Sequence, residues 1–493
     1  MLPVVRSHCD YQSFVAEQLK THYTGGILCI QSPDWNLIEK FWLTDLSKTA
    51  FILRDTFSKQ GPRPRDPADM LRSILLMVQT GVSSVTQWVT LLRRVPLYAI
   101  LSGFIPNKTP GVGTFYDFFA RLWASDSPNF SCKKKRKTKK IKKGARKGEK
   151  APTTSPNKVA NLVKGLERRS AVFKFLPFDR LCALFKEIFV FKSAQLGLLG
   201  DIKNLCLAGD GTPVRTSAYP RSKRTCDCRE KGIFDCECPR IYSQPDCNIG
   251  WDSSRECYFH GYHLYVYTAA ESFYDLPVYP RLYKASRHDS ISMLLSAEEL
   301  QLRYPDWVIS RVLLDAAHDA MPIYHYFNNR DILAFIDLNK RRSGQTKYKD
   351  DFSLSESGIP ICNKGLEMKD NGYDYTRGRR KYRCPLIKKG IVACDSPCST
   401  SSYGRCVYTY TKENIRLFPP IARNSNEWKN AYKRRTSVER SNKREKVDYM
   451  LEAARHRSSK MWNIRIYAIM MCQHMDAWFK ESDLTLQSTL LTA

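Results

Sequence analysis

Three carboxylates in this sequence stand where an enzyme could hold divalent metal ions. Asp210 follows the apolar run LCLAG and Asp315 follows RVLL, which predicts that both lie at strand ends, while Glu439 lies on a later helix. Open α/β sheets build their sites at strand ends. Three converging acids repel one another unless cations bind between them, and oxygen ligands suit Mg²⁺ or Mn²⁺. Two such ions would activate a water and steady the leaving oxygen of a phosphodiester.

Each acid alone also has an ordinary structural explanation. Asp210 precedes a glycine, as in many turns, and Asp315 could cap the next helix. Glu439 could form an ion pair with Lys443 one helical turn away. The metal hypothesis therefore depends on the three acids together and on the residues around Glu439.

The helix of Glu439 lies in the run WKNAYKRRTSVERSNKREK. Tyr432, Arg435, Glu439 and Lys446 follow one another at steps of three, four and seven residues, so on a helix they share a stripe roughly 60° wide. A lone acid among such cations is either a salt-bridge partner or a metal ligand. We expect the cations to hold phosphate oxygens of DNA. The flanking cations expected to contact DNA are Lys433, Arg434, Arg440 and Lys443.

The elements that would position these residues alternate between strand and helix. Five strands are expected, at NLCLAGDGTPV, Tyr258–Ala269, LPVYPRLYKA, WVISRVLLD and DILAFIDLN. The third contains Pro280, which favours an edge position. Helices are expected from a cap at Ser286, over MPIYHYFNNR and from about Asn426 to Arg455, with the apolar run IRIYAIMMCQHMDAWF packing the last onto the sheet. This order predicts a mixed α/β sheet flanked by helices.

The N-terminal part of the chain reads as helical. Residues 1–60 are interpreted as a leader with one or two amphipathic helices, such as Trp35–Phe51. Three helices follow: one from Pro67 to before Gly81, one capped by Ser83 or Ser84, and one from Thr114 to Trp123. They could form a helix-turn-helix that enters DNA or a bundle used for packing or dimerisation. The aromatic content of the third helix favours a core position.

The charge of the chain points to a polyanionic partner. Its 79 basic and 49 acidic residues give a net charge of +30. The run KKKRKTKKIKKGARKGEK (133–150) predicts a disordered tether that continues to about Asn161, yet the rest of the chain is still basic. Nucleic acid is the expected partner, and an anionic membrane surface is the alternative. No run of 18 apolar residues predicts a membrane span and no signal peptide is evident, so a cytoplasmic, nucleoid-associated protein is expected.

Three motifs together resemble the DDE transposases of bacterial insertion sequences. They are Asp210-Gly-Thr212, the Asp-x-x-His-Asp run at Asp315–Asp319, and the Tyr-x2-Arg-x3-Glu-x6-Lys pattern, which is similar to the YREK motif. The resemblance covers residues from about 200 to 455 and implies an RNase H-like core with an insertion between the second Asp and the Glu. It also implies that Asp210, Asp315 and Glu439 bind the metals and that Tyr432, Arg435 and Lys446 contact the element ends. His318 stands where the family usually has Tyr and, with Thr212, is expected beside the metal ligands.

One feature bears on the excision route. Relatives that excise through a DNA hairpin can hold a flipped base on a Trp of the insertion, but no Trp lies between Trp307 and Trp428 here. Tyrosines of the insertion could stack on a base instead. The candidates are Tyr373, Tyr375, Tyr403 and Tyr408.

The 17 cysteines are expected to be reduced thiols or metal ligands. One set, Cys226, Cys228, Cys236 and Cys238, forms two Cys-x-Cys pairs in a polar loop and suits tetrahedral Zn²⁺, with Cys247 and Cys257 as further candidates. A second set is Cys384, Cys394, Cys398 and Cys406. Both sets could instead be structural. His260 and His263 would fall on opposite faces of a strand, and His288-Asp289 is interpreted as a helix cap or a group near the site.

The leading hypothesis is a DNA transposase that cleaves element ends and joins them to target DNA, working with two metal ions and as at least a homodimer. The alternatives are an RNase H-like nuclease without strand transfer and a non-catalytic DNA-binding protein derived from a transposase. The expected domains are 1–131 (helical, for DNA-end binding or dimerisation), 132–161 (basic linker), 162–339 (catalytic core), 340–420 (β-rich insertion) and 421–493 (C-terminal helices with the YREK pattern).

Overall fold

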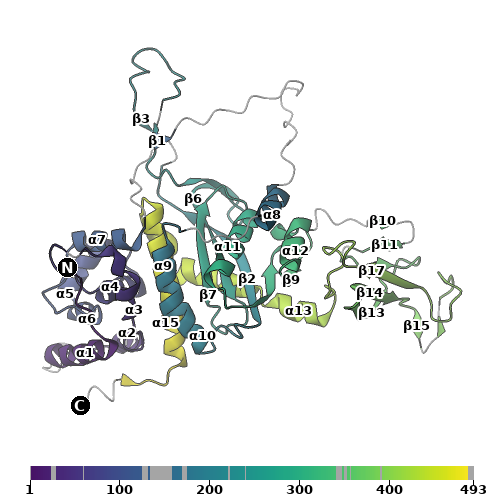
Figure 1. The fold of residues 1–493 in the computed structure, drawn as a ribbon, viewed down its shortest axis with the longest axis horizontal. Coiled ribbons are helices and arrows are strands. Elements are labelled where there is room, and N and C mark those ends of the chain that lie inside the picture. Colours follow the sequence, from purple (N-terminus) through teal and green to yellow (C-terminus); the bar gives the residue numbers. More distant parts are fainter. Residues whose placement is uncertain are drawn as a thin grey trace.

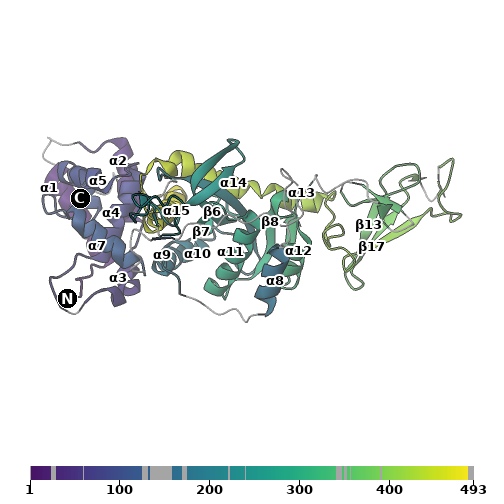
Figure 2. The same cartoon turned by 90° about the horizontal axis from the view of Figure 1, so that it is seen from above.

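The computed structural model describes most of the chain. The described residues are 2–23, 29–58, 60–124, 132–133, 158–168, 175–219, 223–238, 240–339, 347–348, 352–355, 357–388, 391–392 and 394–486. All but the first residue of the predicted tether at 133–150 lies outside them. Helix α8 (Lys158–Arg168) begins within the range expected to be linker. Helices of the N-terminal region lie at one end of the molecule, a large sheet lies in the middle and small sheets lie at the other end (Figure 1, Figure 2).

The central sheet mixes parallel with antiparallel pairs, as predicted. It has six strands where five were expected, because Asn248–Asp252 adds a strand that was not predicted. In the order of the sheet they are β5 (Asn248–Asp252), β6 (Cys257–Ala269), β2 (Leu205–Arg215), β8 (Ile309–Leu314) and β9 (Leu333–Ile336), with β7 (Pro277–Lys284) paired to β6. Strand β2 runs antiparallel to β6 and parallel to β8, which is in turn parallel to β9. The strand containing Pro280 lies at the edge, as its proline predicted.

Helices cover both faces of this sheet. Tyr267 and Thr268 are neighbours on β6 and so point to opposite faces. The hydroxyl of Tyr267 donates to Met293 O of α11 (Asp289–Arg303), whereas that of Thr268 lies 3.1 Å from Ser437 Oγ of α14 (Thr436–Lys443). Helix α11 therefore lies on one face and α14 on the other. The cap of α11 is His288, whose Nδ1 accepts from Ser290 N, and not Ser286.

The N-terminal helices largely follow the sequence signals. They are α1 (His8–Tyr23), α2 (Ser32–Trp42), α3 (Lys48–Ile52), α4 (Pro67–Gln79), α5 (Val85–Arg94), α6 (Pro96–Leu101) and α7 (Val112–Leu122). Pro67 begins α4 and Ser84 caps α5, as expected. Phe115, Phe118 and Phe119 of α7 are buried, which confirms their core position. The stretch 35–51 divides into two helices, and α1 occupies the part interpreted as a leader.

Helix α15 (Ser459–Glu481) joins the N-terminal helices to the sheet (Figure 2). His474 Nε2 lies 2.9 Å from Pro277 O of β7, and its Nδ1 lies 2.7 Å from Ser193 Oγ. On another side of α15, Gln79 of α4 donates to Asp476, and Cys472 Sγ donates to Leu75 O. The predicted packing of this apolar run onto the sheet is confirmed. Before the sheet, α9 (Asp179–Leu184), a π-helical turn (Phe185–Val190) and α10 (Phe191–Gln195) form a further helical stretch.

Burial of His474 predicts a loss of stability in mild acid. Burial lowers its pKa to about 4 in the folded chain; the bond to Pro277 opposes this shift, and the charge of Arg444 adds a smaller lowering. The unfolded chain therefore takes up a proton first, and stability that is complete above pH 6.5 falls as the pH drops toward 4. His474 alone should account for about 2 kcal/mol of loss between pH 7 and pH 5. In urea unfolding at both pH values, His474→Gln should show a smaller pH dependence than wild type, while His325→Gln, at an exposed position, should match wild type.

The segment expected to be a β-rich insertion contains small antiparallel sheets. The strands are β10 (Lys347–Tyr348), β11 (Phe352–Leu354), β12 (Pro360–Ile361), β13 (Lys369–Asp374), β14 (Arg379–Arg383), β15 (Ile387–Lys388), β16 (Ile391–Val392) and β17 (Cys406–Tyr410). They pair as β10-β11-β12, β13-β14-β17 and β15-β16. A separate small core of Ile359, Cys362, Met368, Tyr382 and Val407 lies within this segment. Helices α12 (Met321–Asn328) and α13 (Asn426–Lys433) lie between it and the sheet (Figure 1).

The long helix predicted from Asn426 to Arg455 is broken. It consists of α13 (Asn426–Lys433), α14, a π-helical turn (Arg444–Asp448) and a 3₁₀ turn (Leu451–Ala453). The first two pieces pack on different parts of the sheet. Trp428 of α13 faces Phe335 of β9, with ring centroids 6.3 Å apart, whereas Ser437 of α14 meets Thr268 of β6. Within the described residues, no helix combines the length and apolar character that crossing a membrane needs.

Candidate functional site

Parallel pairing of β2 and β8 brings Asp210 beside Asp315. Ala208 lies opposite Leu313 in this ladder, so the same register continued by two residues places the two aspartates level with each other. Asp210 lies within β2, which continues to Arg215, and not at its end as predicted. It does lie where the pairing with β8 stops. Burial and then the charge of Asp315 raise the pKa of Asp210 to about 6.

Asp315 is held by the turn that follows β8. Its Oδ1 accepts from Ala317 N at 3.1 Å, so the expected capping role is correct, and it lies 2.5 Å from His318 Nδ1. Burial would raise the pKa of Asp315, but the bond and the charge of His318 keep it below its ordinary value. Burial would lower the pKa of His318, but the bond to Asp315 outweighs it and raises that pKa. His318 thus orients Asp315, and Tyr265 Oη at 3.2 Å contacts its other ring nitrogen.

Glu439 lies on the helix that covers Asp210. Asn442 Nδ2, one turn further along α14, donates to Asp210 Oδ2 at 3.4 Å. Glu439 itself accepts from Arg435 Nη2 at 2.6 Å and is about half exposed. Among the described residues, Asp210, Asp315 and Glu439 are not a group whose ligand atoms all lie within 4.8 Å of one another. The fold thus places the three acids in one region, and Glu439 is bound to Arg435 there.

Of the stripe expected from helical spacing, Tyr432, Arg435 and Glu439 lie together, whereas Lys446 does not. The guanidinium of Arg435 lies 5.8 Å from the ring centroid of Tyr432, which stacks on Trp428 at 4.4 Å. The charge of Arg435 contributes to lowering the pKa of Asp315, so this end of the stripe faces the aspartate pair. Lys446 lies in the π-helical turn. Burial lowers its pKa, and its facing charges are those of Glu452 and Asp252, so it belongs to a different cluster.

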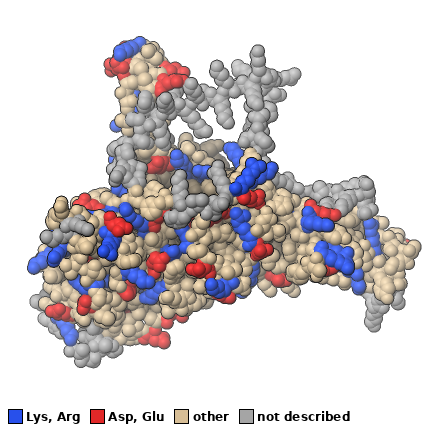
Figure 3. All heavy atoms as spheres, in the orientation of Figure 1, with Lys and Arg blue, Asp and Glu red and all other residues tan. Residues whose placement is uncertain are grey.

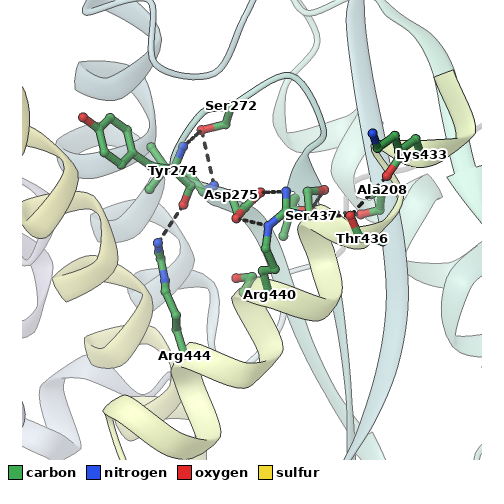
Figure 4. A network of polar contacts seen from close by, with 12 residues as sticks. Ala208, Ser272, Tyr274, Asp275, Lys433, Thr436, Ser437, Arg440 and Arg444 are labelled. Carbon is green, nitrogen blue, oxygen red and sulfur yellow. Dashed lines mark hydrogen bonds and ion pairs between the residues drawn. The ribbon is translucent and has the colours of Figure 1, made fainter. Parts of the chain in front are cut away.

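Two of the flanking cations already have acidic partners within the chain. Arg440 binds Asp275 through two bonds of 2.7 and 2.6 Å, next to Arg444, which donates to Tyr274 O (Figure 4). Arg434 Nη1 lies 2.5 Å from Glu271. These bonds fix α14 to the β6–β7 turn. All four flanking cations predicted to contact DNA are exposed, namely Lys433, Arg434, Arg440 and Lys443.

Sequence reasoning did not find the pair His263–Asp289. His263 Nε2 of β6 lies 2.7 Å from Asp289 Oδ1, at the start of α11. The pair presses on Gly211, where an added Cβ would lie 2.3 Å from His263 Cε1 and 2.5 Å from Asp289 Oδ1. The charge of Asp289 also raises the pKa of Asp210. Thr212 is buried two residues after Asp210 on the same strand. No local spacing in the sequence signals the histidine–aspartate pair.

Only one of the two cysteine sets is gathered, as far as the described residues show. The Sγ atoms of Cys226, Cys228, Cys236 and Cys238 all lie within 4.8 Å of one another, so this cluster could hold a zinc ion. The second set (Cys384, Cys394, Cys398 and Cys406) does not form such a group, and Cys247 and Cys257 are not part of the first. Cys247 instead donates to Gln244 Oε1, and Cys257 accepts from Arg215. Comparison of the chain with models of known families and with curated proteins finds no match.

Proposed function

We propose that this protein is a metal-dependent DNA transposase of the DDE type, built on an RNase H-like core. The observation that carries the proposal is the pairing of β2 with β8, which sets Asp210 beside Asp315 under the helix of Glu439. Two aligned carboxylates at the end of a parallel ladder, with a third on the covering helix, form an oxygen-rich donor set for hard divalent cations.

These residues fit Mg²⁺ or Mn²⁺ by their chemistry. Asp210 has a raised pKa because it is buried and faces another acid, and a cation would relieve that repulsion. Asp210 and Asp315 would hold the ions, and Glu439 would join them after leaving Arg435. The bound ions would supply activation of a water or 3′-hydroxyl and neutralise charge on the phosphodiester.

The chain's own side chains would orient the site. Asn442 fixes the Asp210 carboxylate and His318 fixes that of Asp315. Arg435 is paired with Glu439, and releasing Glu439 would free its guanidinium for a phosphate oxygen. Tyr432 stacks on Trp428, and its ring lies beside the Arg435 guanidinium.

The charge of the chain supports DNA as the substrate. The run 133–150 holds twelve basic residues and one acidic residue, so it contributes +11 of the net charge of +30 and the rest of the chain still carries +19. Lys and Arg side chains are scattered across the visible face (Figure 3). Such a distribution suits long contacts with a phosphate backbone. Joining two element ends would require two copies of the chain, so a homodimer at work is part of the proposal.

The test is a cleavage and joining assay with the full chain. The substrate is linear DNA that carries the native sequences on both sides of the coding region, with a supercoiled plasmid as target. We expect Mg²⁺-dependent 3′-hydroxyl ends and plasmid-joined products, all stopped by a chelator. Cleavage without joining would favour the RNase H-like nuclease, and DNA binding without cleavage would favour the non-catalytic alternative.

Arg435→Ala should weaken binding to the flanking DNA. Removal of one phosphate contact is expected to lower affinity and to reduce the slope of log affinity against log salt by about one. The measurement is a salt titration of fluorescence anisotropy, with Arg457→Ala, a cation outside the stripe, as the matched control. An unchanged salt slope would remove Arg435 from the DNA interface.

A further inference from the structure

We propose that Cys226, Cys228, Cys236 and Cys238 bind one structural Zn²⁺ that folds the loop between β3 (Lys223–Arg224) and β4 (Arg240–Ile241). Cys226 Sγ lies 3.6 Å from Cys236 Sγ, and Cys228 Sγ lies 3.6 Å from Cys238 Sγ. Zinc–sulfur bonds of about 2.3 Å in a tetrahedron set the sulfurs about 3.8 Å apart. Two of the six sulfur–sulfur distances therefore lie close to the tetrahedral value, and all six are at most 4.8 Å.

The loop has no hydrophobic interior of its own. Every residue from Arg229 to Asp235 is exposed, including Ile233 at 52% and Phe234 at 67%. The only buried residue between Lys223 and Cys238 is Cys236. The inside of the loop thus consists of sulfur atoms. Two flanking strands of two residues each cannot hold such a hairpin, so a metal is the natural source of its stability.

The turn between the cysteine pairs brings them together. Glu230 N donates to Asp227 O at 2.9 Å, and Ile233 N donates to Cys228 O at 2.7 Å. Gly232 supplies the left-handed conformation, with φ of 73°, that reverses the chain. This turn returns the second Cys-x-Cys pair to the first, which explains why a spacing of one residue within each pair is sufficient.

The charge of the loop argues for a structural role. The residues from 223 to 238 include four cations and four acids, so the loop itself is not a basic surface for phosphates. The cations are Lys223, Arg224, Arg229 and Lys231, and the acids are Asp227, Glu230, Asp235 and Glu237. Strand β4 pairs with β3 and with β1 (Cys132–Lys133). A zinc ion in this loop would thereby stabilise the small sheet in which β1 pairs with β4, in the segment that follows β2.

Metal content is the first test and does not depend on DNA cleavage. We expect one zinc per purified full-length chain by mass spectrometry, and close to none in the variant with Cys226→Ser and Cys236→Ser. Cys406→Ser, from the second set, should keep one. Cobalt replacement should give the visible bands of a tetrahedral tetrathiolate site. Iron in place of zinc, zinc retained by the double variant, or zinc lost with Cys406→Ser would overturn the proposal.

A second measurement uses the wild-type chain, so it stands even if the double variant fails to fold. Zinc should protect the four cysteines from alkylation and should slow tryptic cleavage after Arg229 and Lys231, and a chelator should remove both protections. Protection that persists without metal, or disulfides among the four cysteines in mass spectra under non-reducing conditions, would contradict the assignment.

Discussion

Asp210→Asn should abolish Mg²⁺-dependent cleavage while leaving the fold intact. Metal coordination supplies several kcal/mol of transition-state stabilisation, which corresponds to a loss of at least about a hundredfold in rate. The buried Asp210 has a raised pKa next to Asp315, so a neutral amide removes repulsion and should hold or raise the melting temperature. Asn442 can still donate to the new side-chain oxygen. Rate and thermal stability measured on one preparation test both parts.

Matched controls separate this result from general charge effects. Asp306→Asn changes an exposed acid of the same chain and should leave the rate unchanged. Glu439→Gln should also abolish cleavage, whereas Glu427→Gln, on the first turn of α13, should not. Wild-type cleavage by Asp210→Asn or by Glu439→Gln would show that these carboxylates do not hold a catalytic metal.

Asp319→Asn should cost about 3 kcal/mol of unfolding free energy, because it leaves a largely buried guanidinium without a counter-charge. Arg416 binds Asp319 through two bonds of 2.7 and 2.6 Å, and the Asp319 side chain is fully buried. Asn339 N also donates to this carboxylate. The bonds join the turn after β8 to the chain that leaves the small sheets. Urea unfolding measures the effect.

The control for this prediction is an exposed ion pair in the same part of the chain. Asp374 Oδ2 lies 3.8 Å from Arg377 Nε and 3.6 Å from Arg379 Nε, and the Asp374 side chain is 40% exposed. Asp374→Asn should therefore cost less than about 1 kcal/mol. Equal urea midpoints for the Asp319 and Asp374 variants would mean that the bond to Arg416 contributes little. Arg416→Met tests the same bond from the other side.

Local pattern predicted the sheet well because its strands carry their own signals. The alternation in Tyr258–Ala269 and the apolar run before Asp315 each mark a strand whose bounds nearly match β6 and β8. The end of β2 was missed because Gly211 and Pro213, which usually interrupt strands, are paired here with β6. Gly211 is needed where His263 and Asp289 approach the backbone.

The details of the site depend on tertiary contacts that spacing cannot encode. The break between α13 and α14 arises because Trp428 and Ser437 pack on different strands, and the following π-helical turn carries Lys446 toward Glu452. The two cysteine sets look alike in sequence, and the turn at Gly232 gathers only one of them in the described part of the chain. The elements that carry Asp315 and Glu439 were predicted better than the contacts that orient these side chains.

The place of α15 has a consequence for synthesis on the ribosome. Gln79 of α4 and Asp476 of α15 are hydrogen-bonded although 397 residues separate them. The helices at the start of the chain emerge early, but one wall of their core is made hundreds of residues later. The apolar face of α4 is therefore exposed in the nascent chain until α15 is made, and exposed apolar surface of this kind is what chaperones bind. A product truncated before Ser459 would lack α15, so the apolar face of α4 would stay exposed and the product should be found in the insoluble fraction.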